Sequence, residues 1–99
     1  MKEDFEEPSN SDDIKSSIER YEEMIRKQDQ YFFDVEAFVN IVDYYITKND
    51  PVRALQVVEY AKEQHPYSVS FLLKEAQLLA ITEQPTKALK ILDKAYLMD

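Results

Sequence analysis

The chain has 99 residues, a net charge of −8, and neither glycine nor cysteine. A chain of this length forms one domain with a thin core, because a domain this small buries only about 60–65% of its unfolded surface. The lack of cysteine excludes disulfide frameworks, thiolate metal sites and cysteine nucleophiles, and the lack of glycine argues against Walker and dinucleotide-binding loops.

Charge and hydropathy narrow the possible partners and the location. Binding to a nucleic-acid backbone depends on clustered Lys and Arg, so the acidic balance argues against such a partner. No apolar run approaches the roughly 20 residues that span a bilayer. The first residues also lack the basic start and apolar stretch of a secretory signal. We therefore expect no membrane contact and a cytoplasmic location.

An acidic segment opens the chain, where residues 1–13 hold six carboxylates and a single lysine. A short acidic tail cannot bury enough apolar surface to offset the entropy lost when it is ordered. We predict a disordered, solvated leader over residues 1–11. Phe5 leaves open an alternative, a docking peptide that combines acidic and aromatic residues.

Residues 12–33 are predicted to form an N-terminal capping helix followed by a joint. Ser11 or Asp12 can cap the helix, which runs to about Lys27. Residues 28–33 then join it to the next helix. The apolar residues of the capping helix recur at helical spacing, and they are Ile14, Ile18, Tyr21 and Ile25.

Four further helices are predicted after the joint. Asp and Ser are favoured as caps, and proline is favoured at the first helical position, where its missing N–H costs nothing. Helices of about 13 residues with short turns make antiparallel helical pairs. The residues expected to begin or end these helices are, in chain order, Asp34, Val35, Asn49, Asp50, Pro51, Pro66, Ser68 and Pro85.

The chain repeats itself at a fixed period. Residues 51–55 read PVRAL and residues 85–89 read PTKAL, so the period is the distance from Pro51 to Pro85. A fixed period of roughly 20 to 50 residues is typical of a solenoid, in which repeats stack their apolar faces on one another. Small residues recur seven apart on one helix face, where they let paired helices approach closely. These residues are Ala54 and Ala61 in one copy and Ala88 and Ala95 in the other.

The same shift along the sequence can be applied to the capping helix. Ile18, Tyr21 and Met24 align with apolar positions of the third helix, so this face is predicted to stack on the array. Arg20 and Lys27 stand where the third helix has its alanines. We interpret the helix as a half-repeat or cap, apolar toward the array and charged outward, as a terminal repeat requires.

Large apolar residues and small residues recur in the two helical pairs, and a proline follows the first pair. The residues are Phe38, Tyr45, Ala54, Val58, Ala61 and Pro66 in the first pair and Leu72, Ala76, Leu79, Ala88, Leu92 and Ala95 in the second. This pattern resembles the tetratricopeptide repeat (TPR) family over residues 35–99. The resemblance implies an all-α, right-handed superhelical solenoid of helix-turn-helix units with about five helices. It places the first pair at residues 34–67 and the second at residues 68–99.

Three residues stand apart from this pattern. Val42 is larger than the small residue that the family usually has at its position, and Glu75 falls where a leucine is common. We expect Glu75 to reach solvent or to pair with a lysine, and a polar anchor near a groove is the alternative. His65 is the only histidine; it precedes Pro66 at a helix end, and we assign it a structural role.

In TPR arrays the first helices of successive pairs line a concave groove that holds an extended peptide or a partner helix. By this resemblance Asn40 and Gln77 can bond a peptide backbone, while Val39 and Leu73 supply apolar contact. Packing against neighbouring helices is the alternative role for several of these residues. Lys74 is the only basic one, so the carboxylate clamp of the chaperone-binding branch is not expected. The groove positions are Glu36, Val39, Asn40, Asp43 and Ile46 in the first unit and Ser70, Leu73, Lys74, Gln77 and Ile81 in the second.

No residues assemble a catalytic, metal or cofactor site by their spacing, so we expect a binding module for a protein or peptide and not an enzyme. The alternative is a structural scaffold or a self-association segment with no other partner. The chain stops one residue short of a proline expected from the period, and we predict that it is the N-terminal part of a longer repeat protein. Leu89, Leu92 and Met98 would then form an open apolar edge suited to self-association.

Overall fold

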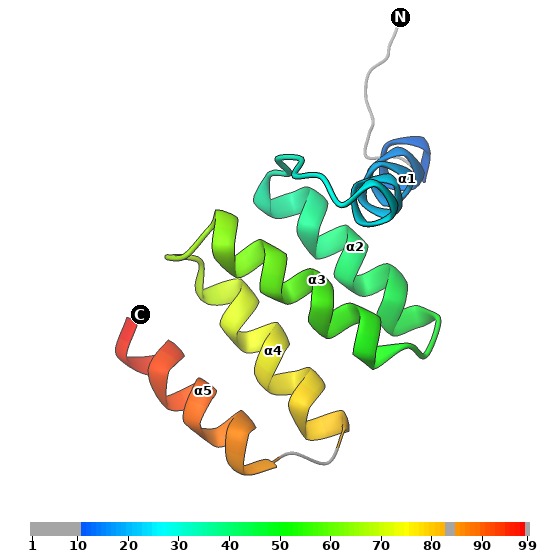
Figure 1. Cartoon of the computed structure of the whole chain (residues 1–99). Coiled ribbons are helices and arrows are strands. Elements are labelled where there is room, and N and C mark those ends of the chain that lie inside the picture. Colours follow the sequence, from blue (N-terminus) through cyan, green and yellow to red (C-terminus); the bar gives the residue numbers. More distant parts are fainter. Residues whose placement is uncertain (1–10, 83–84, 99) are drawn as a thin grey trace, which may run out of the picture.

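The computed structural model describes residues 11–82 and 85–98, and all of its regular structure is helical, as predicted. Within these ranges there is no strand. Most of the predicted leader, residues 1–10, lies outside the described residues. The five helices are α1 (Ser11–Lys27), α2 (Val35–Thr47), α3 (Pro51–Gln64), α4 (Val69–Ile81) and α5 (Pro85–Met98) (Figure 1).

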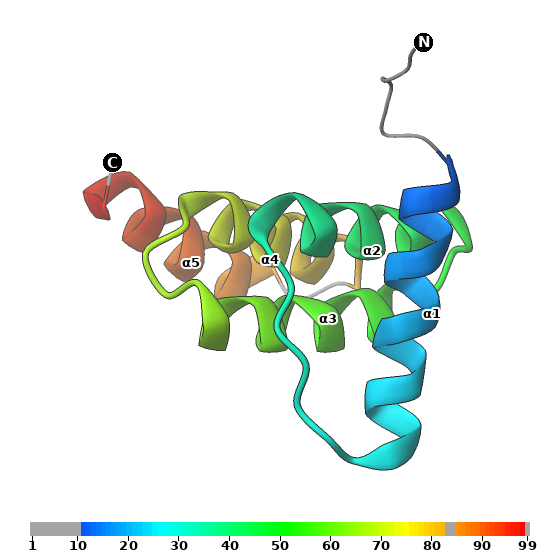
Figure 2. The ribbon, with the colours of Figure 1, turned by 90° about the horizontal axis from the view of Figure 1, so that it is seen from above.

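The helices from α2 to α5 form a helical-repeat-like array in which each helix packs against the next one in the chain. Seen from above, α2 and α4 lie in one layer and α3 lies in the other (Figure 2). The core runs through the middle of this array. Its largest fully buried side chains include Phe38, Phe71, Ile41 and Leu78.

Alanines form the close contacts of the array, as the repeat pattern predicted. Ala54 and Ala61 on α3 are fully buried, and Ala76 on α4 and Ala95 on α5 are nearly so. The side chain of Ala88, for which the same role was predicted, lies outside the described residues. Because an alanine projects only a methyl group, paired helices can approach closely at these positions.

Helix α1 crosses the end of the array instead of lying alongside α2 (Figures 1 and 2). It buries Ile18, Tyr21 and Met24 against the array. Ile25, which was predicted on the apolar stripe, is instead 41% exposed. The crossing explains this difference, because a helix that lies across its neighbours contacts them over a shorter part of its length than one that lies alongside.

The joint, residues 28–34, is an extended segment that runs back past the C-terminal end of α3 (Figure 2). The Gln64 side chain of α3 binds the joint through two hydrogen bonds. The Gln64 Nε2 donates to the Tyr31 carbonyl at 2.7 Å, and the Gln64 Oε1 accepts from the Phe33 N–H at 3.0 Å. The His65 ring nitrogen Nε2 contacts the Phe33 carbonyl at 2.7 Å. Phe33 is buried, whereas Phe32 is exposed and lies against the His65 ring.

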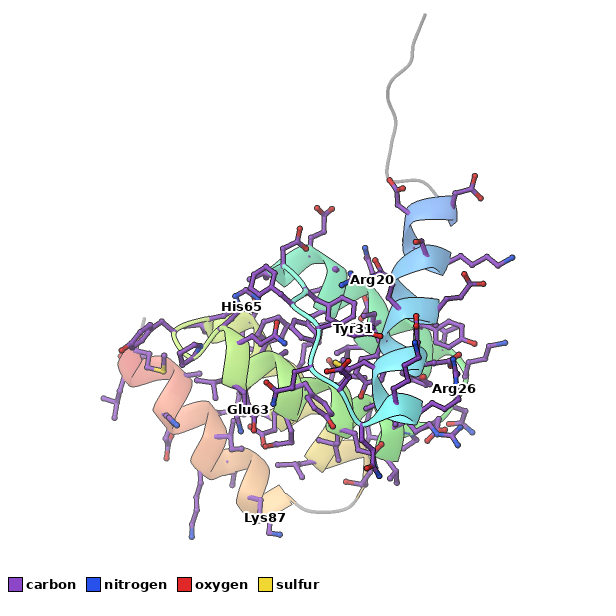
Figure 3. The ribbon with its side chains drawn as sticks, turned by 45° about the horizontal axis from the view of Figure 1, so that its top comes forward. Arg20, Arg26, Tyr31, Glu63, His65 and Lys87 are labelled. Atoms are coloured by element: carbon purple, nitrogen blue, oxygen red, sulfur yellow. The ribbon has the colours of Figure 1, made fainter. Side chains whose placement is uncertain are left out.

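Arg20 is exposed, as expected for a charged outer face, but its guanidinium contacts the joint. Its guanidinium lies over the Phe33 ring, with Cζ 4.5 Å from the ring centroid, and it donates to the Phe32 carbonyl at 3.3 Å (Figure 3). The repeat pattern provides no preceding helix to pack on this side of α1. The joint covers that side instead. Lys27, by contrast, is exposed and pairs with Glu23 at 2.7 Å.

The predicted cap of α2 is confirmed, and α3 begins at the predicted turn with Pro51 in its first position. Asp34 accepts a hydrogen bond from the Ala37 N–H at 2.8 Å, and Asp50 accepts one from the Arg53 N–H at 3.2 Å. Ser68 occupies the N-cap position of α4, but its side chain makes no capping bond, so the prediction that it caps this helix was wrong.

Two helices end in a left-handed residue although the chain has no glycine. Gln28 after α1 and Asn49 after α2 have φ values of 55° and 59°. In both places the N–H groups of this residue and of the next one bond back to the last turn, as when Asp29 bonds to the Met24 carbonyl at 3.1 Å. Asparagine tolerates this conformation better than most residues, whereas glutamine is strained in it.

Candidate functional site

All ten residues of the predicted groove reach the surface of the α2–α4 layer. Six of them are exposed, namely Glu36, Asp43, Ser70, Leu73, Gln77 and Ile81, and four are partly buried, namely Val39, Asn40, Ile46 and Lys74. The partly buried Val39 also packs against the core, so its side chain has both of the roles that were considered for it. The structure thus presents these side chains on one face, made by two helices that occupy equivalent positions in successive repeats.

An ion pair joins the two helices across this face. The Lys74 Nζ of α4 lies 2.8 Å from the Asp43 Oδ1 of α2. An exposed pair of this kind adds at most about 1 kcal/mol to stability. The ion pair matters more for what it shows of the arrangement: α2 and α4 bring two of the predicted groove residues into direct contact.

An acidic hollow of about 450 Å³ lies at one end of this face, between α1 and the start of α2. Asp13, Asp34 and Glu36 bring three carboxylates to it, and Asn40 adds an amide. The hollow therefore extends the predicted groove toward α1 and gives that end a negative potential. A cationic group of a partner is the natural complement of such a surface.

The opposite end of the face is apolar. A small hollow of about 130 Å³ lies between the C-terminal ends of α2 and α4, with Ile46 and Ile81 in its wall together with Leu78. The groove was predicted to include Ile46 and Ile81. Ile81 is exposed, so this end offers a partner apolar contact.

A buried ion pair lies between α3 and α4. Glu75 is only 7% exposed, and its Oε1 accepts a hydrogen bond from the Lys62 Nζ at 2.9 Å, which confirms that it pairs with a lysine. Burial raises the pKa of the Glu75 carboxyl, and the contact with Lys62 only partly opposes that effect. Partial burial acts to lower the pKa of Lys62, but Glu75 and Glu59 together raise it. Lys62 is more exposed than Glu75, so burial costs the Glu75 carboxylate more than the Lys62 ammonium. For this reason the pKa of Glu75 rises even though the carboxyl has an ionic partner.

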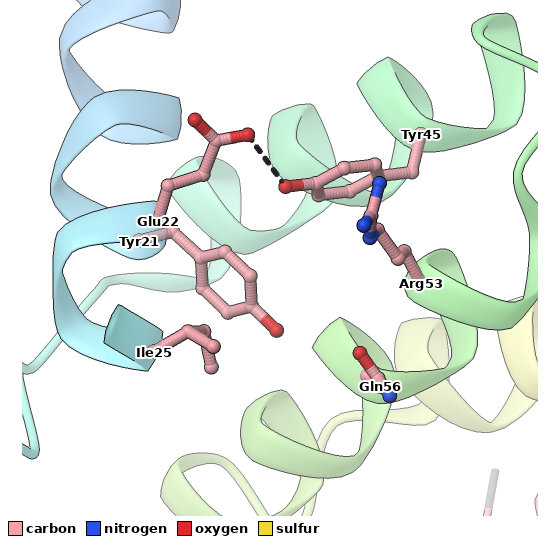
Figure 4. Close-up of a pocket in the computed structure, with 6 residues that line it drawn as sticks. All are labelled: Tyr21, Glu22, Ile25, Tyr45, Arg53 and Gln56. Atoms are coloured by element: carbon pink, nitrogen blue, oxygen red, sulfur yellow. Dashed lines mark hydrogen bonds between the residues drawn. The ribbon is translucent and has the colours of Figure 1, made fainter. Parts of the chain in front are cut away.

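A second pocket, which sequence reasoning missed, lies where α1 meets α2 and α3. Its volume is about 260 Å³ (Figure 4). The Tyr45 hydroxyl donates to the Glu22 Oε2 at 2.9 Å in its wall. Tyr21 is buried, and within the described part of the chain its hydroxyl has no hydrogen-bond partner. A buried polar group left unpaired costs about 1–3 kcal/mol.

No signal in the sequence pointed to this pocket. Tyr21 has the helical spacing of a core residue, and Tyr45 matches a large position of the repeat. Both expectations of burial were right. The pocket exists because α1 crosses the array, and periodicity carries no information about a crossing angle.

Residues 11–82 and 85–98 contain no group of three His, Asp or Glu side chains placed to hold a metal ion. Over the same ranges no helix is long and apolar enough to cross a membrane. The His65 ring contacts the Phe33 carbonyl of the joint and lies beside aromatic rings, among them those of Phe38 and Phe71. These contacts give it a structural role at the end of α3.

Comparisons with protein-family models, with curated proteins and with solved structures gave no match to this chain.

Proposed function

We propose that this chain is a TPR-like module that binds a peptide or a partner helix across the α2–α4 face. One observation supports the proposal: α2 and α4 share a layer, and the Lys74–Asp43 ion pair joins two of the predicted groove positions across it. Exposed apolar and amide side chains of α4 suit a bound segment, since Leu73 offers apolar contact and Gln77 offers hydrogen bonds to a backbone.

The charges of the face suggest the chemistry and the direction of the bound segment. Three carboxylates surround the hollow beside α1, while the far end is apolar. A segment with a basic residue near α1 and an apolar residue near Ile81 would complement both ends. The chain's net charge of −8 would also speed the approach of a basic partner at low salt.

Affinity capture with a matched pair of variants tests this proposal. Leu73→Glu places a charge on the α2–α4 face, and Val52→Glu places the same charge on α3, where Val52 is likewise an exposed apolar residue. We expect a partner captured from lysate of the source organism to be lost with Leu73→Glu and kept with Val52→Glu. Raising the salt concentration should weaken capture, since the acidic hollow contributes to binding. Equal capture by both variants would refute the α2–α4 face as the site.

The surface of α5 favours a second candidate function, self-association. Leu89, Leu92 and Tyr96 are exposed and recur at helical spacing, so they form an apolar stripe on the last helix. Light scattering over a range of protein concentrations tests this candidate. A mass that rises with concentration and becomes constant in a Leu89→Glu/Leu92→Glu variant would support self-association, and a constant monomer mass for the natural sequence would exclude it.

A further inference from the structure

The pocket between α1, α2 and α3 is built from side chains of mixed chemistry. Tyr21, Glu22 and Ile25 come from α1, Tyr45 comes from α2, and Arg53 and Gln56 come from α3 (Figure 4). The pocket is accessible, because the Arg53 side chain is 68% exposed and Ile25 also reaches solvent. It lies apart from the α2–α4 face, with which it shares no residue.

Tyr21 supplies the strongest indication of a ligand. The residue is only 3% exposed, and its hydroxyl has no hydrogen-bond partner within the described ranges. The rings of Phe33, Tyr45 and Tyr60 surround its own ring at centroid distances of 6.0–6.3 Å, so the side chain cannot turn toward solvent. Figure 4 shows the hydroxyl directed into the space beside Gln56. A group from outside the chain is needed to complete its hydrogen bonding.

A hydrogen-bond acceptor on the ligand suits this wall best. Burial, with smaller contributions from Tyr60 and Tyr45, raises the pKa of Tyr21, so the hydroxyl keeps its proton at neutral pH and can donate it. Arg53 is also a donor, has no acceptor capacity and forms an exposed ion pair with Asp50. A cation could donate to the Tyr21 oxygen, but it would offer no acceptor to either group and would lie beside the Arg53 charge.

The same ligand must also present a donor. A carboxylate can accept about four hydrogen bonds, and the Tyr45 hydroxyl supplies one of those of Glu22. A ligand carboxylate would face this negative charge and would be disfavoured. An amide can form hydrogen bonds with both groups, because its carbonyl oxygen can accept from the Tyr21 hydroxyl and its N–H can donate to the Glu22 carboxylate.

We propose that this pocket binds a primary amide on a short aliphatic chain, the chemistry of a glutamine side chain. A volume of about 260 Å³ is smaller than the pockets that enclose drug-sized ligands. The exposed Ile25 provides an apolar wall for the aliphatic part. The amide belongs either to a free small molecule or to a peptide, and the two sources share this recognition.

The first experiment uses three probes of nearly the same shape and different charge: butyramide, butyrate and butylammonium. Each is titrated into the ¹⁵N-labelled chain of 99 residues, and chemical shifts are followed by NMR. A probe with so few atoms binds on the order of millimolar. We expect saturable shifts with butyramide that centre on the residues lining the pocket, and at least tenfold weaker binding of the two charged probes. No saturable shift with butyramide, as for a pocket that holds water only, would overturn the proposal.

Two variants locate the recognition, and one serves as a control. Tyr21→Phe removes only the buried hydroxyl and should weaken butyramide at least tenfold, whereas Tyr67→Phe removes an exposed hydroxyl in the turn between α3 and α4 and should leave butyramide binding unchanged. Glu22→Gln should narrow the preference for butyramide over butyrate, because it removes the negative wall. Unchanged butyramide affinity in Tyr21→Phe, or an unchanged preference in Glu22→Gln, would refute the assignment.

A peptide probe distinguishes the two sources of the amide. The capped tripeptide acetyl-Gly-Gln-Gly-N-methylamide is titrated beside acetyl-Gly-Glu-Gly-N-methylamide, which has a carboxylate in place of the side-chain amide and so carries no primary amide. If the ligand is a peptide, the glutamine peptide should bind more tightly than butyramide. If it is a free small molecule, butyramide should bind at least as well as the peptide. Tighter binding of the glutamate peptide would contradict the proposal.

Discussion

Replacing Glu75 by leucine should make the protein more stable. Glu75 is 7% exposed and pairs with Lys62 at 2.9 Å, but burial still raises the pKa of its carboxyl above the ordinary value of 4.5. A raised pKa means that the ionised carboxylate is less favourable in the folded protein than in the unfolded chain. The lysine therefore compensates only part of the cost of burying this charge.

The size of the effect follows from three contributions. Burying a leucine side chain contributes about 2 kcal/mol, and removing the carboxylate removes a desolvation cost of about 1–3 kcal/mol. Against these stands the loss of a charge-assisted hydrogen bond, about 1.5–3 kcal/mol. Lys62 is not left alone, since it keeps Glu59 at 3.5 Å. We expect a net gain of about 1–2 kcal/mol at pH 7, which raises Tm by roughly 5–10 °C for a domain of this size.

The gain should depend on pH in one direction. Because the folded pKa of Glu75 lies above the unfolded value, the folded state binds the proton more tightly between the two values. The stability that Glu75 contributes is thus fully present below pH 4.5 and falls as pH rises through the raised pKa. The advantage of Glu75→Leu should therefore be larger at pH 7 than at pH 4, while titration of the other carboxylates cancels in the difference.

Urea unfolding followed by circular dichroism at the two pH values measures this difference. Glu63→Leu is the matched control, since Glu63 is an exposed carboxylate on α3, and it should change stability by less than about 0.5 kcal/mol at either pH. A Glu75→Leu protein less stable than the natural one at pH 7 would show that the ion pair is a net stabiliser. A gain that does not change with pH would refute the raised pKa.

Three further substitutions test the helical array by thermal unfolding. Ala61→Leu should overpack the fully buried face of α3 and cost about 1–3 kcal/mol; an unchanged Tm would count against the close helix contact. Asp34→Ala should cost about 1 kcal/mol because it removes the cap on the Ala37 N–H, and Asp34→Asn, which keeps a capping oxygen, should restore most of that loss. Gln28→Gly should stabilise by about 0.5–1 kcal/mol, because glycine adopts the left-handed conformation without strain; a loss of stability would argue against this conformation in solution.

The helices and much of their packing could be predicted from local patterns. Pro51 and Asp50 begin α3 for reasons that act within one turn of the chain, and the repeat period placed Ala54 and Ala61 in the core. The resemblance to TPR repeats placed the ten groove positions on two helices, α2 and α4, which prove to share a layer. Whether these residues hold a partner remains a prediction.

Other features were decided only when the chain folded. Arg20 has the spacing of an outward charge, yet it lies over Phe33 because the joint folds back along α1. The caps of α2 and α4 look alike in sequence, but only Asp34 makes its hydrogen bond and Ser68 does not. The position of Arg20 depends on where the joint comes to lie, which local composition does not state; nothing in the structure explains why the Ser68 side chain makes no capping bond.

The sequence by itself determined the all-α class, the helix starts at Asp34 and Pro51, and the pairing of helices at the repeat period, because each depends on neighbours within one or two turns or on a repeated face. The tertiary structure alone decided the crossing of α1, the fold-back of the joint and the pocket with its unpaired Tyr21 hydroxyl. Hydrophobic periodicity states which face of a helix is buried. It does not state at what angle that face meets its neighbour, and that angle determines which polar groups are left inside.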